Sequence, residues 1–129
     1  KTFMHAEKVL RQTGESVFLT PEGARITSGE IAKFNKGSFH LATNLKAPII
    51  PIFINIPKSI DPGIGYNALP GHVDVYILPK IETKDWSHDD LVKHVDEVRN
   101  IYIEFREKLR KECYTPELHA QSARKLMAS

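Results

Sequence analysis

The feature that most restricts the fold is an apolar run at residues 47–57, which reads APIIPIFINIP. A membrane-spanning helix needs about 20 apolar residues, and this run is about half as long and contains three prolines. A short and nearly continuous apolar run is typical of a strand that is covered on both faces, as in a parallel sheet between helices. We therefore expect a buried strand at residues 48–56.

The segments around this run alternate between helical and strand patterns. Residues 2–12 and 37–45 have apolar side chains at helical spacing, and Gly14 is a suitable stop for the first helix. Residues 16–20 (SVFLT) and 72–81 (HVDVYILPKI) have strand patterns. This order predicts an α/β fold, with a partly parallel sheet and flanking helices.

The C-terminal segment, residues 86–127, is predicted to be helical. Ser87 and Asp90 have the spacing of a capping box, and Thr115 and Pro116 fit the start of a second helix. Between these two starts, apolar residues recur at steps of four and three, which places them in one stripe on a long helix. The stripe consists of Leu91, Val95, Val98, Tyr102, Phe105 and Leu109.

Composition excludes several classes of protein. The chain of 129 residues has the size of one domain, and 41% hydrophobic with 26% charged residues is typical of a soluble fold. A net charge of +2 gives no reason to expect a nucleic-acid partner. The single cysteine, Cys113, excludes an internal disulfide, and the six histidines do not cluster at ligand spacing, so no metal site is expected.

A Glu and an Arg flank a glycine directly after the predicted strand at 16–20, in the sequence FLTPEGAR. Loops at the carboxyl end of a strand commonly carry ligand-binding groups in α/β folds. Gly23 permits a tight turn or close approach of a ligand, and the guanidinium of Arg25 suits a phosphate. Glu22 could accept hydrogen bonds from hydroxyls or hold Arg25. The alternative is a solvated turn with an incidental ion pair.

Three ordered blocks resemble signatures of the glycerophospholipid acyltransferase family, which includes lysophosphatidic acid and glycerol-phosphate acyltransferases. The blocks are LTPEGAR at 19–25, FNKGSF at 34–39 and PIIPI at 48–52. The family usually has Phe-Pro-Glu-Gly-Thr-Arg, then Phe-Lys-x-Gly-x-Phe about ten residues on, then Pro-Ile-x-Pro-Val. Three blocks in the same order and with matching gaps are more specific than any one of them.

The resemblance implies that Glu22, Gly23 and Arg25 receive the glycerol-phosphate group of the acyl acceptor. Arg25 would pair with the phosphate, and Lys36 would be a second cation. Gly37 would open the following helix, whose amide dipoles favour a nearby anion. These residues are the expected substrate-binding site.

Two departures from the family pattern limit this interpretation. Ala24 replaces the usual Thr, which puts the acceptor preference in doubt. Family members activate the acceptor hydroxyl with the His of a His-x-x-x-x-Asp motif, but none of the six histidines here has an Asp at the fifth following position. For Phe39 and Pro51 packing is the simpler explanation of the match, and for Lys36 packing and substrate binding both remain open.

We therefore expect residues 1–129 to be the C-terminal portion of one acyltransferase domain. The catalytic His and Asp would belong to a missing N-terminal portion, so no residue of this chain is expected to be catalytic and the isolated chain is expected to be inactive. A sheet without its neighbouring strands would also expose an edge and favour aggregation.

The resemblance also implies a reaction. A fatty acyl group would pass from acyl-CoA or an acyl-carrier protein to a hydroxyl of glycerol-phosphate or a lysophospholipid, in phospholipid synthesis or remodelling. The acyl donor is a co-substrate, and no cofactor is expected. Family habit implies association with a membrane surface, at its cytoplasmic face. The alternative is a non-catalytic relative that binds lipid phosphate or protein.

Overall fold

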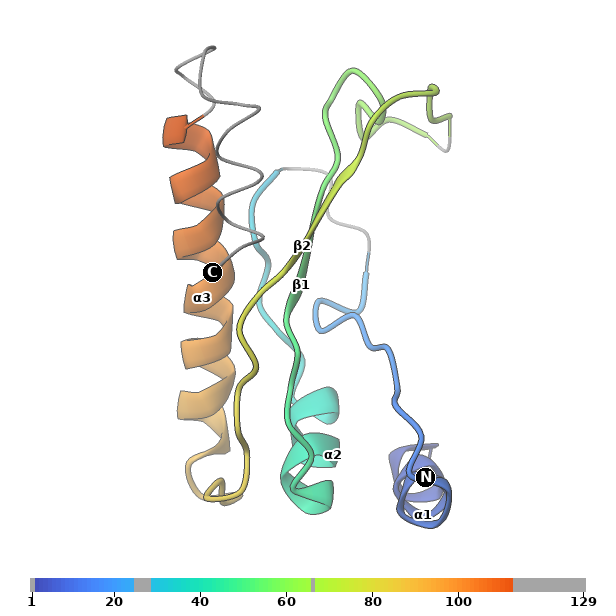
Figure 1. The fold of residues 1–129 in the computed structure, drawn as a ribbon, viewed down its shortest axis with the longest axis vertical. Coiled ribbons are helices and arrows are strands. Elements are labelled where there is room, and N and C mark those ends of the chain that lie inside the picture. Colours follow the sequence, from blue (N-terminus) through green and yellow to red (C-terminus); the bar gives the residue numbers. More distant parts are fainter. Residues whose placement is uncertain (1, 25–28, 66, 113–129) are drawn as a thin grey trace.

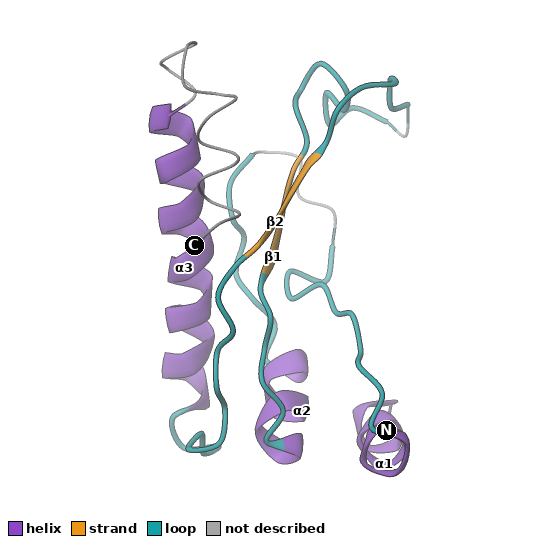
Figure 2. Cartoon of the chain, in the orientation of Figure 1, coloured by secondary structure: helices purple, strands orange, loops and turns teal. Residues whose placement is uncertain are grey.

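The computed structural model describes residues 2–24, 29–65 and 67–112. Its elements are α1 (Thr2–Thr13), α2 (Gly37–Leu45), β1 (Ile52–Asn55), β2 (Asp74–Ile77) and α3 (Leu91–Glu112). In Figure 1, α3 runs alongside the two strands, α1 and α2 lie near one end of them, and the loop between the strands lies at the other end. Figure 2 shows how much of the chain between these elements is loop.

The two strands form an antiparallel pair. One face of the pair packs on α3, where the ring of Phe105 lies 5.4 Å from that of Phe53 and 5.1 Å from that of Tyr76. An isolated bridge between Ile49 and Ile81 continues the pairing beyond the strands. The register pairs Ile52 with Ile77, Phe53 with Tyr76, Ile54 with Val75 and Asn55 with Asp74.

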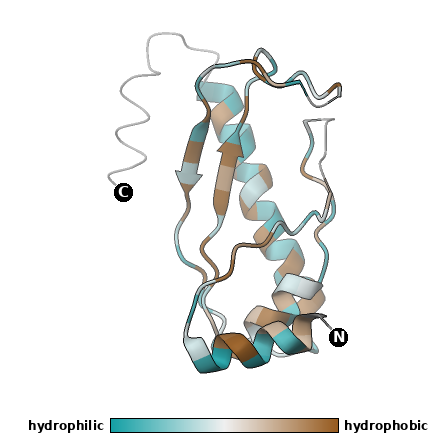
Figure 3. Ribbon diagram, turned by 90° about the vertical axis from the view of Figure 1, so that its right-hand side faces the viewer, coloured by the Kyte–Doolittle hydropathy of each residue, from teal (hydrophilic) through white to brown (hydrophobic). Residues whose placement is uncertain are grey.

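The expectation of a partly parallel sheet is wrong for the described residues, because both strands of their sheet are antiparallel. The expected burial of both faces is also wrong, since Ile54 is 48% exposed, Val75 48% and Ile77 73%. Hydrophobic residues, brown in Figure 3, follow both strands. The continuous apolar run therefore reflects one buried face and one open face, rather than two covered faces.

The strand expected at residues 16–20 is not formed in the structure. The segment lies outside every helix and strand, and Phe18 is 67% exposed. A strand needs a neighbouring strand to pair its backbone N–H and C=O groups, and the described residues give SVFLT no such pairing. Its β-rich composition alone does not make it a strand.

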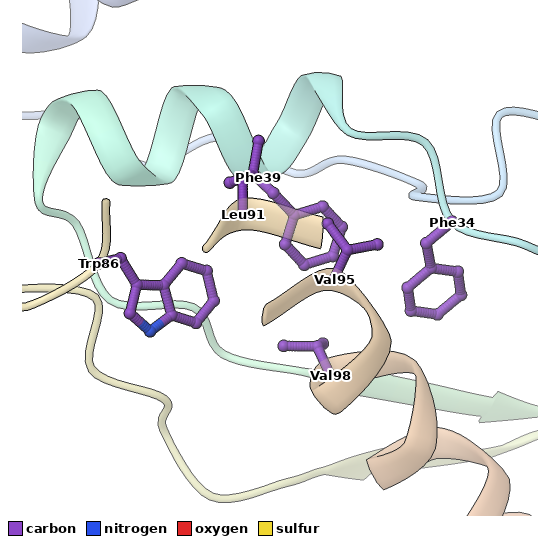
Figure 4. Packing of buried hydrophobic residues seen from close by; sticks show 6 residues of the cluster. All are labelled: Phe34, Phe39, Trp86, Leu91, Val95 and Val98. Carbon is purple, nitrogen blue, oxygen red and sulfur yellow. The ribbon is translucent and has the colours of Figure 1, made fainter. Parts of the chain in front are cut away.

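The helices expected at residues 2–12 and 37–45 are confirmed, and the long C-terminal helix is confirmed from Leu91 to Glu112. α1 ends at Thr13 and is followed by Gly14, which has φ 67°, and α2 has the expected bounds. The stripe on α3 faces inward, with its valines buried against α2 and the preceding loop. Figure 4 shows this core, which consists of Phe34, Phe39, Trp86, Leu91, Val95 and Val98.

The start of α3 differs from the expected capping box. The helix begins at Leu91, and the Ser87 hydroxyl donates to the Asp90 carboxylate at 3.3 Å. A helix capped by Ser87 would begin with the next residue, so the sequence pattern placed the start too early. The second helix expected from Thr115 and Pro116 lies outside the described residues.

Candidate functional site

The loop containing the PEGAR sequence is closed by hydrogen bonds between its two ends. The backbone N–H of Ala32 donates to Glu22 Oε1 at 2.7 Å, and the N–H of Asn35 donates to the Pro21 carbonyl at 2.7 Å. The side-chain amide of Asn35 also donates to the Glu22 carbonyl, at 3.2 Å. The Glu22 carboxylate is therefore engaged within the loop, where it joins residues ten positions apart.

Gly23 forms the tight turn that was expected of it. Its N–H donates to the Thr20 carbonyl at 3.1 Å, and its φ of 69° lies in the left-handed region. A Cβ atom at this position would lie 2.5 Å from Asn35 Nδ2. Glycine is therefore required here both for its backbone conformation and for the close approach of the Asn35 amide.

Arg25, the residue expected to bind phosphate, lies outside the described residues. Its neighbours on the two sides are described: Gly23 is held in the turn, and the Gly29 carbonyl accepts hydrogen bonds from α3. A contact between Glu22 and Arg25, one of the two roles expected for Glu22, stays a prediction.

Lys36 and Gly37 lie at the start of α2. Lys36 is the N-cap residue, and its side chain is exposed and makes no capping hydrogen bond. A Cβ atom on Gly37 would lie 2.7 Å from Cε2 of the Phe3 ring. Gly37 thus has a packing role, since it allows α1 to approach α2, in addition to any role toward a substrate.

Asn35 connects the two halves of the expected site and was missed by the sequence interpretation. It bonds to Pro21 and Glu22 and immediately precedes Lys36. A signal was present, because a short amide side chain directly before a helix commonly bonds to nearby backbone. The structure therefore brings Glu22, Gly23 and the start of α2 together through this one residue.

Tyr102 links this loop to the core electrostatically. Burial raises the pKa of its hydroxyl, the hydrogen bond that its oxygen accepts from the Ile52 N–H at 3.1 Å opposes this effect, and the negative charge of Glu22 raises the pKa further. The hydroxyl therefore stays neutral at physiological pH and serves as an acceptor for β1.

A second polar cluster joins α1, α2 and the loop before α3. His40 Nδ1 lies 3.2 Å from His88 Nδ1, and His88 Nε2 lies 2.7 Å from Asn44 Oδ1. The Asn44 amide donates to Glu7 Oε2 at 2.9 Å, and Arg11 bonds to the other carboxylate oxygen of Glu7. This cluster ties α1 to α2.

Among residues 2–24, 29–65 and 67–112, no group of three or more His, Cys, Asp or Glu side chains is placed to hold a metal ion. None of the helices in these ranges is both long enough and apolar enough to span a bilayer.

The sequence of this chain resembles that of known proteins. A family model described as Acyltransferase matches residues 1–55, which include the turn at Gly23 and the start of α2. The 1-acyl-sn-glycerol-3-phosphate acyltransferase of Limnanthes alba is 28% identical over 103 residues, which are 80% of this chain and 37% of that protein. The 1-acyl-sn-glycerol-3-phosphate acyltransferase alpha of Mus musculus is 33% identical over 98 residues, which are 70% of this chain and 33% of the mouse protein.

The match covers only part of each relative, since the chain spans about a third of the length of the curated relatives it matches. No solved structure gives a significant match. The family model and the named relatives are both acyltransferases. The three blocks that suggested the family all lie within residues 1–55. The chain therefore belongs to the acyltransferase family, with homologues that are 1-acyl-sn-glycerol-3-phosphate acyltransferases over part of their length.

Proposed function

We propose that the whole protein containing this chain transfers a fatty acyl group to a hydroxyl of glycerol-phosphate or a lysophospholipid. The observation that carries the proposal is the family match over residues 1–55, which contain the LTPEGAR and FNKGSF blocks. The matched relatives are named for 1-acyl-sn-glycerol-3-phosphate, which makes it the first acceptor to test. The acyl donor is acyl-CoA or an acyl-carrier protein.

In this proposal the chain supplies the part of the site that holds the acceptor's phosphate. Arg25 pairs with the phosphate through its planar set of donors, and Lys36 with the start of α2 provides further positive potential. Glu22 holds the loop in place, a role supported by its 2.7 Å hydrogen bond from the Ala32 N–H. Gly23 and Gly37 allow the close packing that shapes the loop and the helix start.

The chemical step needs a base that this chain does not supply in the family's arrangement, because none of its histidines begins a His-x-x-x-x-Asp motif. On the family pattern, such a His takes the proton of the acceptor hydroxyl. The hydroxyl oxygen attacks the thioester carbonyl, the carbon–sulfur bond breaks, and the carrier leaves as its thiol. We propose that the reaction takes place at the cytoplasmic face of a membrane, where an acylated acceptor would reside.

The test of the phosphate role is Arg25→Ala in the whole protein, assayed with 1-acyl-glycerol-3-phosphate and acyl-CoA. Loss of a charge-assisted hydrogen bond of about 1.5–3 kcal/mol should raise the KM for the acceptor about ten- to a hundredfold. The acceptor KM of Arg25→Lys should lie between those of the wild type and Arg25→Ala, because lysine keeps the charge but not the paired donors. The matched control is Lys33→Ala, which removes an exposed cation eight positions further along the chain. An unchanged acceptor KM in Arg25→Ala would exclude the role.

The second candidate is a non-catalytic relative that binds lipid phosphate or protein, and the missing His-x-x-x-x-Asp motif favours it. Acyl transfer by the purified whole protein would exclude this candidate. Binding of phosphatidate-containing vesicles without acyl transfer, weakened by Arg25→Ala, would support it. The isolated chain should show no acyl transfer under either candidate, and turnover by the purified chain would refute the proposal that the base lies outside it.

A further inference from the structure

One face of the two-stranded sheet is covered by α3, and the other face is open. Successive residues of a strand point to opposite faces, so Phe53 and Tyr76, whose rings pack on Phe105, define the covered face. Ile54 and Val75 are paired across the open face, and each is 48% exposed. The described helices therefore leave this face of the sheet without a covering layer.

The open face carries aliphatic side chains along the whole of the described pair of strands. Ile52 and Ile77 form its second cross-strand pair, and exposed Ile56 and Val73 occupy the next alternate positions just beyond the strands. Such a contiguous apolar surface is rare on the outside of a monomeric protein and marks a site of contact. The open face thus consists of Ile52, Ile54, Ile56, Val73, Val75 and Ile77.

The residue types of the open face are those of a protein interior. Interfaces that form and dissociate are enriched in Tyr, Trp, Met and Arg, and surfaces that lie on a membrane are enriched in Trp, Tyr, Lys and Arg. The open face has none of these types and consists of β-branched Ile and Val. Such residues are typical of strands covered by helices in a layered α/β fold. This composition favours a permanent contact within one polypeptide.

The dimensions of the open face match those of one helix. Two neighbouring strands are about 10 Å wide, and a helix with its side chains is about 10 Å in diameter. From Ile52 to Ile56 the face is about 13 Å long, at about 3.3 Å per residue, which a helix of about nine residues spans. On the opposite face, α3 runs alongside the same strands in this way (Figure 1).

We infer that the open face is the packing surface for an amphipathic helix from the part of the whole protein outside residues 1–129. The chain spans about a third of the length of its curated relatives, so a protein of their size has ample length to supply this helix. A sheet that is apolar on both faces needs a layer on each of them. The inference does not depend on the proposed reaction, since a catalytic and a non-catalytic protein would both need the cover.

The first measurement is the rate of thiol labelling in the whole protein. Ile77→Cys places a thiol at the most exposed position of the open face, and mass spectrometry of its peptide follows labelling by a water-soluble maleimide. Lys80→Cys is the matched control, because the Lys80 side chain is 57% exposed and lies three positions further along the chain. Position 77 should react at least about tenfold more slowly than the control, and equally fast in urea. Equal rates in the folded protein would overturn the inference.

The second measurement identifies what covers the open face. The variant Ile77→p-benzoylphenylalanine of the whole protein, irradiated in phospholipid vesicles, should form a cross-link to a peptide of the same molecule from outside residues 1–129. A mixture of isotope-labelled and unlabelled protein distinguishes cross-links within one molecule from those between two copies. Cross-links only to lipid, to a second copy or within residues 1–129 would refute the inference, and so would the absence of any cross-link.

A folding defect in the cross-linking variant is covered by a second position. Ile56 lies just beyond the end of β1, where the bulk of the same probe is easier to accommodate. Should the variant at Ile77 fail to fold, Ile56→p-benzoylphenylalanine decides by the same outcomes. Neither measurement reads activity, so a failure of the proposed acyl transfer would leave both results standing.

Discussion

Replacing Gly23 by alanine should destabilise the protein more than a single added methyl group would suggest. Gly23 has φ 69°, a conformation that residues with a Cβ atom adopt at a cost of about 1–2 kcal/mol. The added Cβ would also lie 2.5 Å from Asn35 Nδ2, closer than van der Waals contact allows. The Asn35 amide would have to move.

The second effect has its own magnitude. Moving the amide breaks the 3.2 Å hydrogen bond from Asn35 Nδ2 to the Glu22 carbonyl, and a neutral hydrogen bond contributes about 0.5–1.5 kcal/mol. Added to the backbone term, this predicts that Gly23→Ala lowers the free energy of unfolding by about 1.5–3.5 kcal/mol.

Urea unfolding, followed with the m-value compared between variants, measures this loss. Gly14→Ala is the matched control, because Gly14 has φ 67° but nothing within 4 Å of an added Cβ, so only the backbone term of about 1–2 kcal/mol applies. In an Asn35→Ala background, the loss of unfolding free energy caused by Gly23→Ala should fall to that caused by Gly14→Ala. Equal losses for Gly23→Ala and Gly14→Ala in the wild-type background would refute the reasoning.

Two further predictions concern hydrogen-bonded titrating groups. Tyr102→Phe removes the acceptor of the Ile52 N–H and should lower the free energy of unfolding by about 0.5–1.5 kcal/mol. Burial raises the pKa of Tyr102 above its ordinary 10.0, so the wild type should also lose stability as pH rises from 10.0 through that raised value. The Tyr102→Phe variant should lack this loss. If the Tm values of the two proteins change in parallel with alkaline pH, this prediction is contradicted. Hydrogen bonds from Asn44 and Arg11 lower the pKa of Glu7 below its ordinary 4.5. The stability this contributes is present above pH 4.5 and lost as pH falls toward the lowered pKa, so Glu7→Gln should flatten the acid side of the Tm profile, and an unchanged acid slope would argue against the role of these bonds.

The helices could be predicted from the sequence because their signals are local. The three- and four-residue spacing of apolar side chains predicts α2 and the buried face of α3, and the structure has both. Gly14 predicts the end of α1, since a left-handed residue after a helix is most easily a glycine. These features depend on residues a few positions apart.

The sheet could not be predicted in the same way. The run at 48–56 is apolar enough for a strand buried on both faces, but the structure leaves Ile54 and Ile77 exposed on one side. The β-rich residues 16–20 have no strand partner among the described residues. Strand pairing depends on which segments meet in space, and neither hydropathy nor β-propensity contains that information.

In the candidate site, too, local features could be predicted from the sequence and long-range contacts could not. The turn at Gly23 was expected from PEGAR, because a glycine after a strand-like run favours a tight turn. The bond from Ala32 to Glu22 and the hydrogen bond from Arg99 of α3 to the Ala32 carbonyl were not expected, since they join residues 10 and 67 positions apart. The role of Arg25 stays a prediction from the family resemblance.

The sequence alone indicated the family, the presence of the three helices and the glycine at the turn of residue 23, because these depend on short patterns and on the conformational freedom of glycine. The antiparallel pairing of the strands, the open face of the sheet and the attachment of residues 29–32 to α3 became known from the folded chain. Such contacts gain their free energy from groups that folding brings together. Their partners, such as Arg99 and Ala32, are far apart along the chain and carry no shared local signal.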